Sequence, residues 1–156
     1  MKAKKIESLL ISILFPLAVG LVSALITNGM RSTYSQLVRP ALSPPAVVFP
    51  IVWTILFILM GISAYLISTS DSEKKAGAMR VYFVQLGFNF FWSIFFFSFG
   101  WYLFSFVWLV ALIILIVKMI RAFKDINPVA AYLQIPYLLW CLFAAYLNFM
   151  IYYLNR

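Results

Sequence analysis

The chain has 156 residues, of which 65% are hydrophobic, 10% are charged and none is histidine. So few charges exclude a soluble globular domain and indicate an integral membrane protein in contact with the lipid bilayer. The net charge of +8 does not indicate a nucleic-acid partner, because no basic soluble segment exists to bind one. Cationic anchors beside anionic lipid headgroups account for that charge.

Four long stretches carry no charged residue: Ser8–Met30, Pro40–Ser70, Val81–Val117 and Ile126–Asn155. A helix needs about 20 apolar residues to cross the bilayer. The third stretch would run about 55 Å as one helix, so we expect a corner at Ser98–Tyr102, around Gly100. The sequence therefore predicts an all-α integral membrane protein, a single domain (1–156) with a bundle of five transmembrane helices. Their expected ranges are 7–28, 46–69, 77–98, 102–123 and 128–153.

The first apolar stretch has two interpretations. Lys2–Lys5 followed by an apolar run and Val22–Ala24 resembles a signal peptide with a small-residue cleavage site. The run continues to Met30, beyond the usual length of such a segment, which favours a retained helix. Gly20 and Ala24 form a small-residue face, which serves either packing within the chain or a homodimer.

Residues 29–45 form a loop before the second helix. Pro40, Pro44 and Pro45 favour a stiff, extended segment, and such a segment suits a lid across the mouth of a bundle. The alternative is a plain connector. Trp53 follows inside the membrane with Phe57 on its face, as a pocket wall or as an interfacial anchor.

The third helix carries two amides in a segment that must lie in hydrocarbon. Gln85, Asn89 and Trp92 share one helical face. A buried amide is costly unless protein or a ligand satisfies it. This face therefore indicates a ligand pocket, or else amides that bond neighbouring helices.

The fifth helix is expected to begin with Asn127 as its N-cap and Pro128 at its first position. Pro136 lies in its interior and should kink the axis. Beyond it, three residues follow each other at intervals of four: Trp140, Ala144 and Asn148. An indole above a small-residue gap suits a flat ligand, although Ala144 equally suits helix packing.

Positive charge is unevenly divided between the two sides of a five-helix bundle. Nine cations lie on the side of the N-terminus: Lys2, Lys4, Lys5, Lys74, Lys75, Arg80, Lys118, Arg121 and Lys124. Arg31, Arg39 and Arg156 lie on the other side. This asymmetry predicts a cytoplasmic N-terminus and an external C-terminus.

The sequence lacks the groups that most enzyme sites use. Without histidine and with Cys141 as the only cysteine, a zinc site or a histidine-based triad is not expected, and we expect no metal and no required cofactor. No carboxylate lies at membrane depth, which disfavours ion-coupled pumping.

Three motifs in register carry a family resemblance. They are Arg39-Pro40 through Pro44-Pro45 with Phe49 and Val52-Trp53, then Gln85-x-x-x-Asn89-x-x-Trp92-Ser93, then Pro136-Tyr137-Leu138-x-Trp140-x-x-Phe143-Ala144 with Asn148. With them, the chain resembles the translocator protein family, also called the peripheral benzodiazepine receptor or tryptophan-rich sensory protein family, and in particular its prokaryotic members. We therefore expect a bacterial cell membrane as its location.

The resemblance implies a five-helix bundle that binds tetrapyrroles such as protoporphyrin, and sterols in some members. Carried over by position, the ligand-binding residues would be Trp53, Gln85, Asn89, Trp92 and Trp140. The chain has Thr33-Tyr34 where the family commonly has Trp-Tyr, and Leu42 where it has an aromatic residue, so the lid is poorer in indole. Further candidate contacts are Tyr34, Phe57, Ala144 and Asn148, with Arg31 and Arg39 for propionates.

Three functions follow as hypotheses. The first is a membrane receptor for porphyrins that transports or senses them. The second is a light-dependent enzyme that degrades the porphyrin, with Trp53 and Trp140 as redox partners; the third is a structural protein without a ligand. In a binding test, Leu112 is expected to face lipid and so to serve as a control.

The C-terminus also matches a proposed sterol-recognition pattern, formed by Leu147, Tyr152 and Arg156. This pattern occurs by chance at many helix ends. Arg156 therefore also fits an interfacial anchor.

Overall fold

The structure is a computed structural model that describes the backbone of residues 1–156 and every side chain except that of Arg31. Arg31, a predicted propionate contact, therefore lies outside the described side chains. Five long helices make up the bundle: α1 (Lys2–Thr27), α3 (Val48–Ser68), α4 (Lys75–Ser93), α5 (Tyr102–Lys124) and α7 (Ile135–Leu154). Four short elements complete it: η1 (Asn28–Met30), α2 (Arg31–Ser35), the π-helical turn η2 (Ile94–Ser98) and α6 (Pro128–Tyr132).

Five helical segments are long and apolar enough to cross a membrane, which confirms the predicted fold class. The segments are Lys2–Met30, Val48–Ser68, Lys75–Ser98, Tyr102–Lys124 and Pro128–Leu154. The shortest of these segments is Val48–Ser68, with 21 residues, and at about 1.5 Å per residue it still matches the roughly 30 Å of hydrocarbon. The other four segments have length to spare for tilt or for their polar ends.

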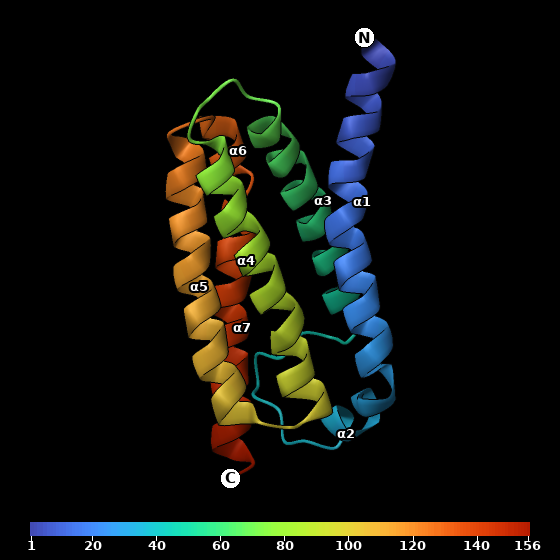
Figure 1. Cartoon of the computed structure of the whole chain (residues 1–156). Coiled ribbons are helices and arrows are strands. Elements are labelled where there is room, and N and C mark those ends of the chain that lie inside the picture. The colour runs from blue at the N-terminus through green and yellow to red at the C-terminus, as the bar shows by residue number, and fades with distance from the viewer.

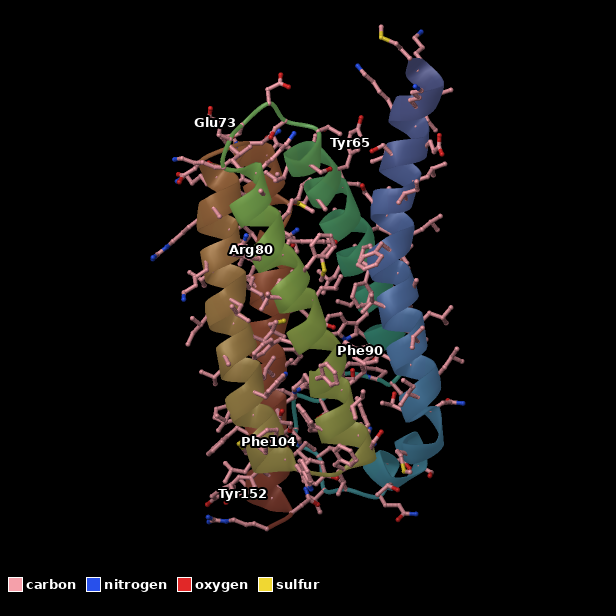
Figure 2. All side chains as sticks on the ribbon, viewed as in Figure 1. Tyr65, Glu73, Arg80, Phe90, Phe104 and Tyr152 are labelled. Carbon is pink, nitrogen blue, oxygen red and sulfur yellow. The ribbon has the colours of Figure 1, made fainter. Side chains whose placement is uncertain are left out.

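The helices lie side by side, and the N- and C-termini lie at opposite ends of the bundle (Figure 1). Helix α1 packs mainly on α3, while α5 packs on α4, α6 and α7. Glu73 lies toward the end that holds the N-terminus, and Phe104 and Tyr152 lie toward the other end (Figure 2).

Leu112 is 1% exposed and belongs to the core, so the expectation that it faces lipid is wrong. Exposed Val107 lies on α5 on the opposite side from the core.

Two glycines allow α1 and α3 to approach closely. Gly61 of α3 faces the α1 backbone, and a Cβ added there would lie 2.6 Å from the carbonyl oxygen of Ser12 and overlap Ile13. Gly20 of α1 lies under the Phe57 ring, which a Cβ would also overlap. The small-residue face of α1 is therefore used for packing within the chain, at least at Gly20.

The corner between α4 and α5 lies where the sequence predicted it. Gly100 has a φ of +64°, a left-handed conformation that glycine adopts without a steric penalty. On either side of Gly100, the amides of Phe99 and Trp101 donate to the carbonyls of Ile94 and Phe95 at 3.1 and 3.0 Å. The widened turn η2 thus ends the helix before α5 begins at Tyr102.

The last membrane segment is broken, where the sequence predicted a kink within one helix. The N-cap prediction holds, since the Asn127 side chain accepts from the amides of Val129 and Ala130. Helix α6, however, ends at Tyr132 and α7 starts at Ile135. Pro136 therefore lies in the first turn of a new helix, where its missing N–H leaves no bond unmade.

The loop before α3 is less extended than its prolines predicted. Its first part folds as η1 and α2, and turns follow near Ala41 and Ala46. The loop is held at the end of α7 by Asn155: the Val38 amide donates to Asn155 Oδ1 at 3.0 Å, and Asn155 Nδ2 donates to the Val38 carbonyl at 2.9 Å. Pro40 is buried, so the segment is fixed at two neighbouring points.

The close contact of α1 with α3 leads to a test on matched glycines. Gly61→Ala is expected to lower the unfolding temperature in detergent, because overpacking costs about 1–3 kcal/mol when backbone cannot yield. Gly87→Ala is the control, since it is also inside a membrane helix and a Cβ there would meet no atom within 4 Å. That control should leave stability unchanged or slightly higher. Equal unfolding temperatures for the two variants would contradict the close packing at Gly61.

Candidate functional site

The two amides of α4 bind a tyrosine of α7. Tyr137 Oη donates to Gln85 Oε1 at 2.8 Å and accepts from Asn89 Nδ2 at 3.0 Å. All three side chains are buried, with Gln85 at 0% and Asn89 at 6% exposure. Because each bond crosses from α4 to α7, this cluster, which we call the amide cluster, joins the two helices at membrane depth.

A second polar cluster lies nearer the end of the bundle that carries the loop of residues 29–45. Asn148 Oδ1 accepts from Trp92 Nε1 at 3.0 Å and from Ser105 Oγ at 3.1 Å. Asn148 Nδ2 donates to the Tyr102 carbonyl at 2.8 Å. Asn148 therefore connects α4, α5 and α7 with one side chain, and the indole N–H of Trp92 is already used.

Trp140 lies at an open groove between α3 and α7. The groove has a volume of about 400 Å³ and is lined by Val52, Ile55, Leu56, Pro136, Leu139, Trp140 and Phe143. Phe49 packs on the Trp140 ring edge-on, at 5.8 Å between centroids. Helix α3 packs on α1, α4 and α6 and has little backbone contact with α7, and this leaves room for the groove. Its lining consists of aliphatic and aromatic side chains, and its volume is typical of small-molecule sites.

Trp53 lies beside this groove, next to Val52 in the chain, and is half-buried. Its ring is 6.2 Å from that of Tyr137, edge-on, and 5.5 Å from that of Phe57. Trp53 thus links the amide cluster to the groove. Phe57, also predicted to contact a ligand, is 6% exposed and packs against α1 at Gly20.

The loop residues occupy the end of the bundle. The Tyr34 ring packs against Phe96 and Phe97, with centroids 5.8 and 5.5 Å away. Burial raises the pKa of the Tyr34 hydroxyl, and the positive charge of Arg39 acts in the opposite direction. The hydroxyl therefore stays protonated at neutral pH. Arg39, which is exposed, supplies that positive charge.

The predicted sterol residues are not on one surface. Leu147 is buried in the core, Tyr152 is half-buried and Arg156 is exposed. The Arg156 guanidinium lies 4.4 Å from the centre of the Tyr153 ring. That cation–π contact fits an anchor at the helix end.

Ala144, the predicted small-residue gap, is 8% exposed and belongs to the core cluster. It therefore packs between helices, which is the alternative to a ligand gap at this position. Among the described side chains, no three His, Cys, Asp or Glu residues come together as metal ligands.

The sequence did not predict the role of three residues in the site. Tyr137 is the centre of the amide cluster, Ser105 bonds Asn148, and Phe49 packs on Trp140. Tyr137 lies one turn from Cys141 and three turns from Asn148 on the buried face of α7. The hydroxyl of Tyr137 on that face could have indicated this role, because a buried hydroxyl requires a hydrogen-bond partner.

Comparison with known proteins agrees with this architecture. The family model described as the TspO/MBR family matches residues 12–154. The chain is 40% identical over 155 residues to the tryptophan-rich protein TspO of Chlorobaculum tepidum, covering 97% of this chain and 98% of that protein. It is 36% identical over 151 residues to the tryptophan-rich protein TspO of Archaeoglobus fulgidus, covering 96% and 98%. The translocator protein of Ovis aries is 30% identical over 129 residues, which cover 79% of this chain and 75% of that protein. The resemblance seen in the three motifs is thus confirmed: the chain is an integral membrane protein and belongs to the TspO/MBR family.

Proposed function

We propose that the protein is a membrane receptor that binds a flat, lipophilic ring system, of which a porphyrin is the type, in the groove between α3 and α7. The observation that carries the proposal is Trp140, which lines an open apolar groove of about 400 Å³. Relatives of this chain are named sensory and translocator proteins. A receptor that senses or carries its ligand fits both names.

Stacking provides the attraction in this groove. Trp140 and Phe143 are neighbouring ring walls with centroids 5.6 Å apart, and Phe49 supports Trp140 from the loop side. An offset aromatic pair contributes about 0.5–1.5 kcal/mol beyond burial. A tetrapyrrole presents several rings at once, so it gains more from such walls than an aliphatic lipid does.

A porphyrin also carries carboxylates, and the groove itself holds no charged side chain. Arg39 lies in the loop that precedes α3, and Ile55 of the groove lies seven residues after the first residue of α3. At about 1.5 Å per residue the groove is therefore about 10 Å from the loop end of the helix. A ring in the groove can place a propionate near this end, where a guanidinium binds carboxylates well.

The amide cluster has a different role in this proposal. Gln85 and Asn89 already bind Tyr137 and are buried, so they hold α4 and α7 in place behind the groove. The groove needs that support because α3 has little contact with α7. The amides thus fix the position of α7, which forms one wall of the groove. Trp53 packs on Tyr137 and so connects the amide cluster to the edge of the groove.

The orientation in the membrane follows from charge. The nine cations of the N-terminal side belong to the end of the bundle where the N-terminus lies (Figure 1). The positive-inside rule places this end in the cytoplasm. The loop with Arg39 and the nearby groove then face the outer side of the membrane.

The first test removes the groove indole. Trp140→Ala is expected to weaken protoporphyrin binding about tenfold or more, because it removes stacking and burial together. The measurement is titration of protoporphyrin fluorescence with protein in detergent or nanodiscs. Trp101→Ala is the matched control, since Trp101 is 51% exposed at the start of α5.

A second control uses a different apolar groove of the bundle. Phe83→Ala alters the groove of about 490 Å³ between α1 and α4, and it should leave the affinity unchanged. A loss of affinity in Phe83→Ala with none in Trp140→Ala would contradict binding between α3 and α7.

The next test concerns the amide cluster. Tyr137→Phe leaves Gln85 Oε1 and Asn89 Nδ2 buried without their partner, and each such group costs about 1–3 kcal/mol. The unfolding temperature should therefore fall well below that of Tyr132→Phe, a control at an exposed tyrosine of α6. Equal stability of the two variants would show that the cluster does not hold the helices.

A further inference from the structure

Four polar atoms in the bundle core have no hydrogen-bond partner among the described side chains and backbone. They are Tyr82 Oη, Gln85 Nε2, Gln134 Nε2 and Gln134 Oε1. Tyr82 is 1% exposed, and Gln85 and Gln134 are 0% exposed. Native proteins rarely leave such groups unsatisfied, and the cost is greatest where no bulk water can reach them.

The helix register brings these atoms to one level of the bundle. Helices α4 and α7 run in the same direction (Figure 1), and Gln85 is paired with Tyr137. Tyr82 lies three residues before Gln85, and Gln134 lies three residues before Tyr137. Gln134 is the N-cap of α7 and keeps a right-handed helical backbone conformation, with φ of −91° and ψ of −8°. On parallel helices these equal steps therefore place Gln134 at about the level of Tyr82, one turn from the amide cluster.

The atoms also complement each other chemically through a small bridging molecule. Gln85 Nε2 and Gln134 Nε2 are donors, Gln134 Oε1 is an acceptor, and the Tyr82 hydroxyl is both. A buried water makes about three hydrogen bonds to such groups and needs two to four polar partners. No charged side chain is among these three residues, and a water molecule can both accept from the donors and donate to the acceptors.

We propose that Tyr82, Gln85 and Gln134 form an internal hydration site that holds one or two water molecules between α4 and the α6–α7 break. The water accepts from Gln85 Nε2, whose Oε1 is already bound by Tyr137. It therefore extends the amide cluster by one turn and fixes which way the Gln85 amide points. The site is separate from the α3–α7 groove, because none of its three residues lines that groove.

The direct test detects water beside these side chains. In bilayers, solid-state NMR transfer of magnetisation from water protons should reach the side-chain nitrogens of Gln85 and Gln134. The internal control is Asn148 Nδ2, which is also buried but donates to the Tyr102 carbonyl, and it should receive no early transfer. A high-resolution crystal structure with Gln134 bonded directly to Tyr82 and no water between them would overturn the proposal.

Variants add a second test, in which the direction of the change in unfolding temperature shows whether water binds the Gln134 amide or the amide is unsatisfied. If water satisfies Gln134, Gln134→Leu removes a bonded group and lowers the unfolding temperature; if the amide is unsatisfied, the same change raises it. Tyr82→Phe should then have a smaller effect in the Gln134→Leu background than in the native chain, because both residues bind the same water. Tyr65→Phe, outside the site, should have the same effect in both backgrounds. A rise in unfolding temperature in Gln134→Leu, or strictly additive effects, would refute the site.

Discussion

The Tyr137 hydroxyl is the contact on which the rest of the bundle depends, because it binds Gln85 Oε1 and Asn89 Nδ2, two polar atoms that would otherwise be buried in hydrocarbon without a partner. Membrane helices gain no hydrophobic energy from association with each other, so polar bonds and close packing must hold them. Here the polar bonds join α4 to α7 at Tyr137 and again at Asn148. Close packing through Gly20 and Gly61 joins α1 to α3.

These two kinds of attachment explain where the groove lies. Helix α3 is held by α1 on one side and by α6 at its far end, where Ser63 Oγ donates to the Ala130 carbonyl at 2.6 Å. The described side chains of α3 and α7 share no hydrogen bond, and the two helices meet there mainly through aromatic rings. The break at Leu133 and Gln134 lets α6 pack on both α5 and α3, while α7 packs on α5 and is bonded to α4 through side chains. A groove between α3 and α7 results from this division.

Local signals predicted the helices well, and contacts between helices poorly. The five membrane segments follow from run length, and the corner follows from Gly100, because both are properties of neighbouring residues. The polar face of α4 was also visible in its spacing. The pairing of this face with Tyr137 could not be predicted, because it depends on the register of two helices and joins residues 52 positions apart in the chain. The burial of Leu112 was missed for the same reason, since an apolar residue on an apolar helix does not show which side faces lipid.

If the groove binds a ligand as proposed, the division between polar core and apolar groove limits how the protein chooses that ligand. Hydrogen bonds to a ligand give the strongest discrimination when the site's own polar groups would otherwise be left unpaired. Tyr137 binds Gln85 Oε1 and Asn89 Nδ2, and the groove lining offers mainly shape and ring faces. In the proposed function, discrimination within the groove therefore rests on flatness and aromatic area. Charge recognition is then left to Arg39, in the loop that Asn155 holds at Val38. If the proposal holds, selectivity among flat ligands with different acidic groups is a property of the loop, and affinity is a property of the groove.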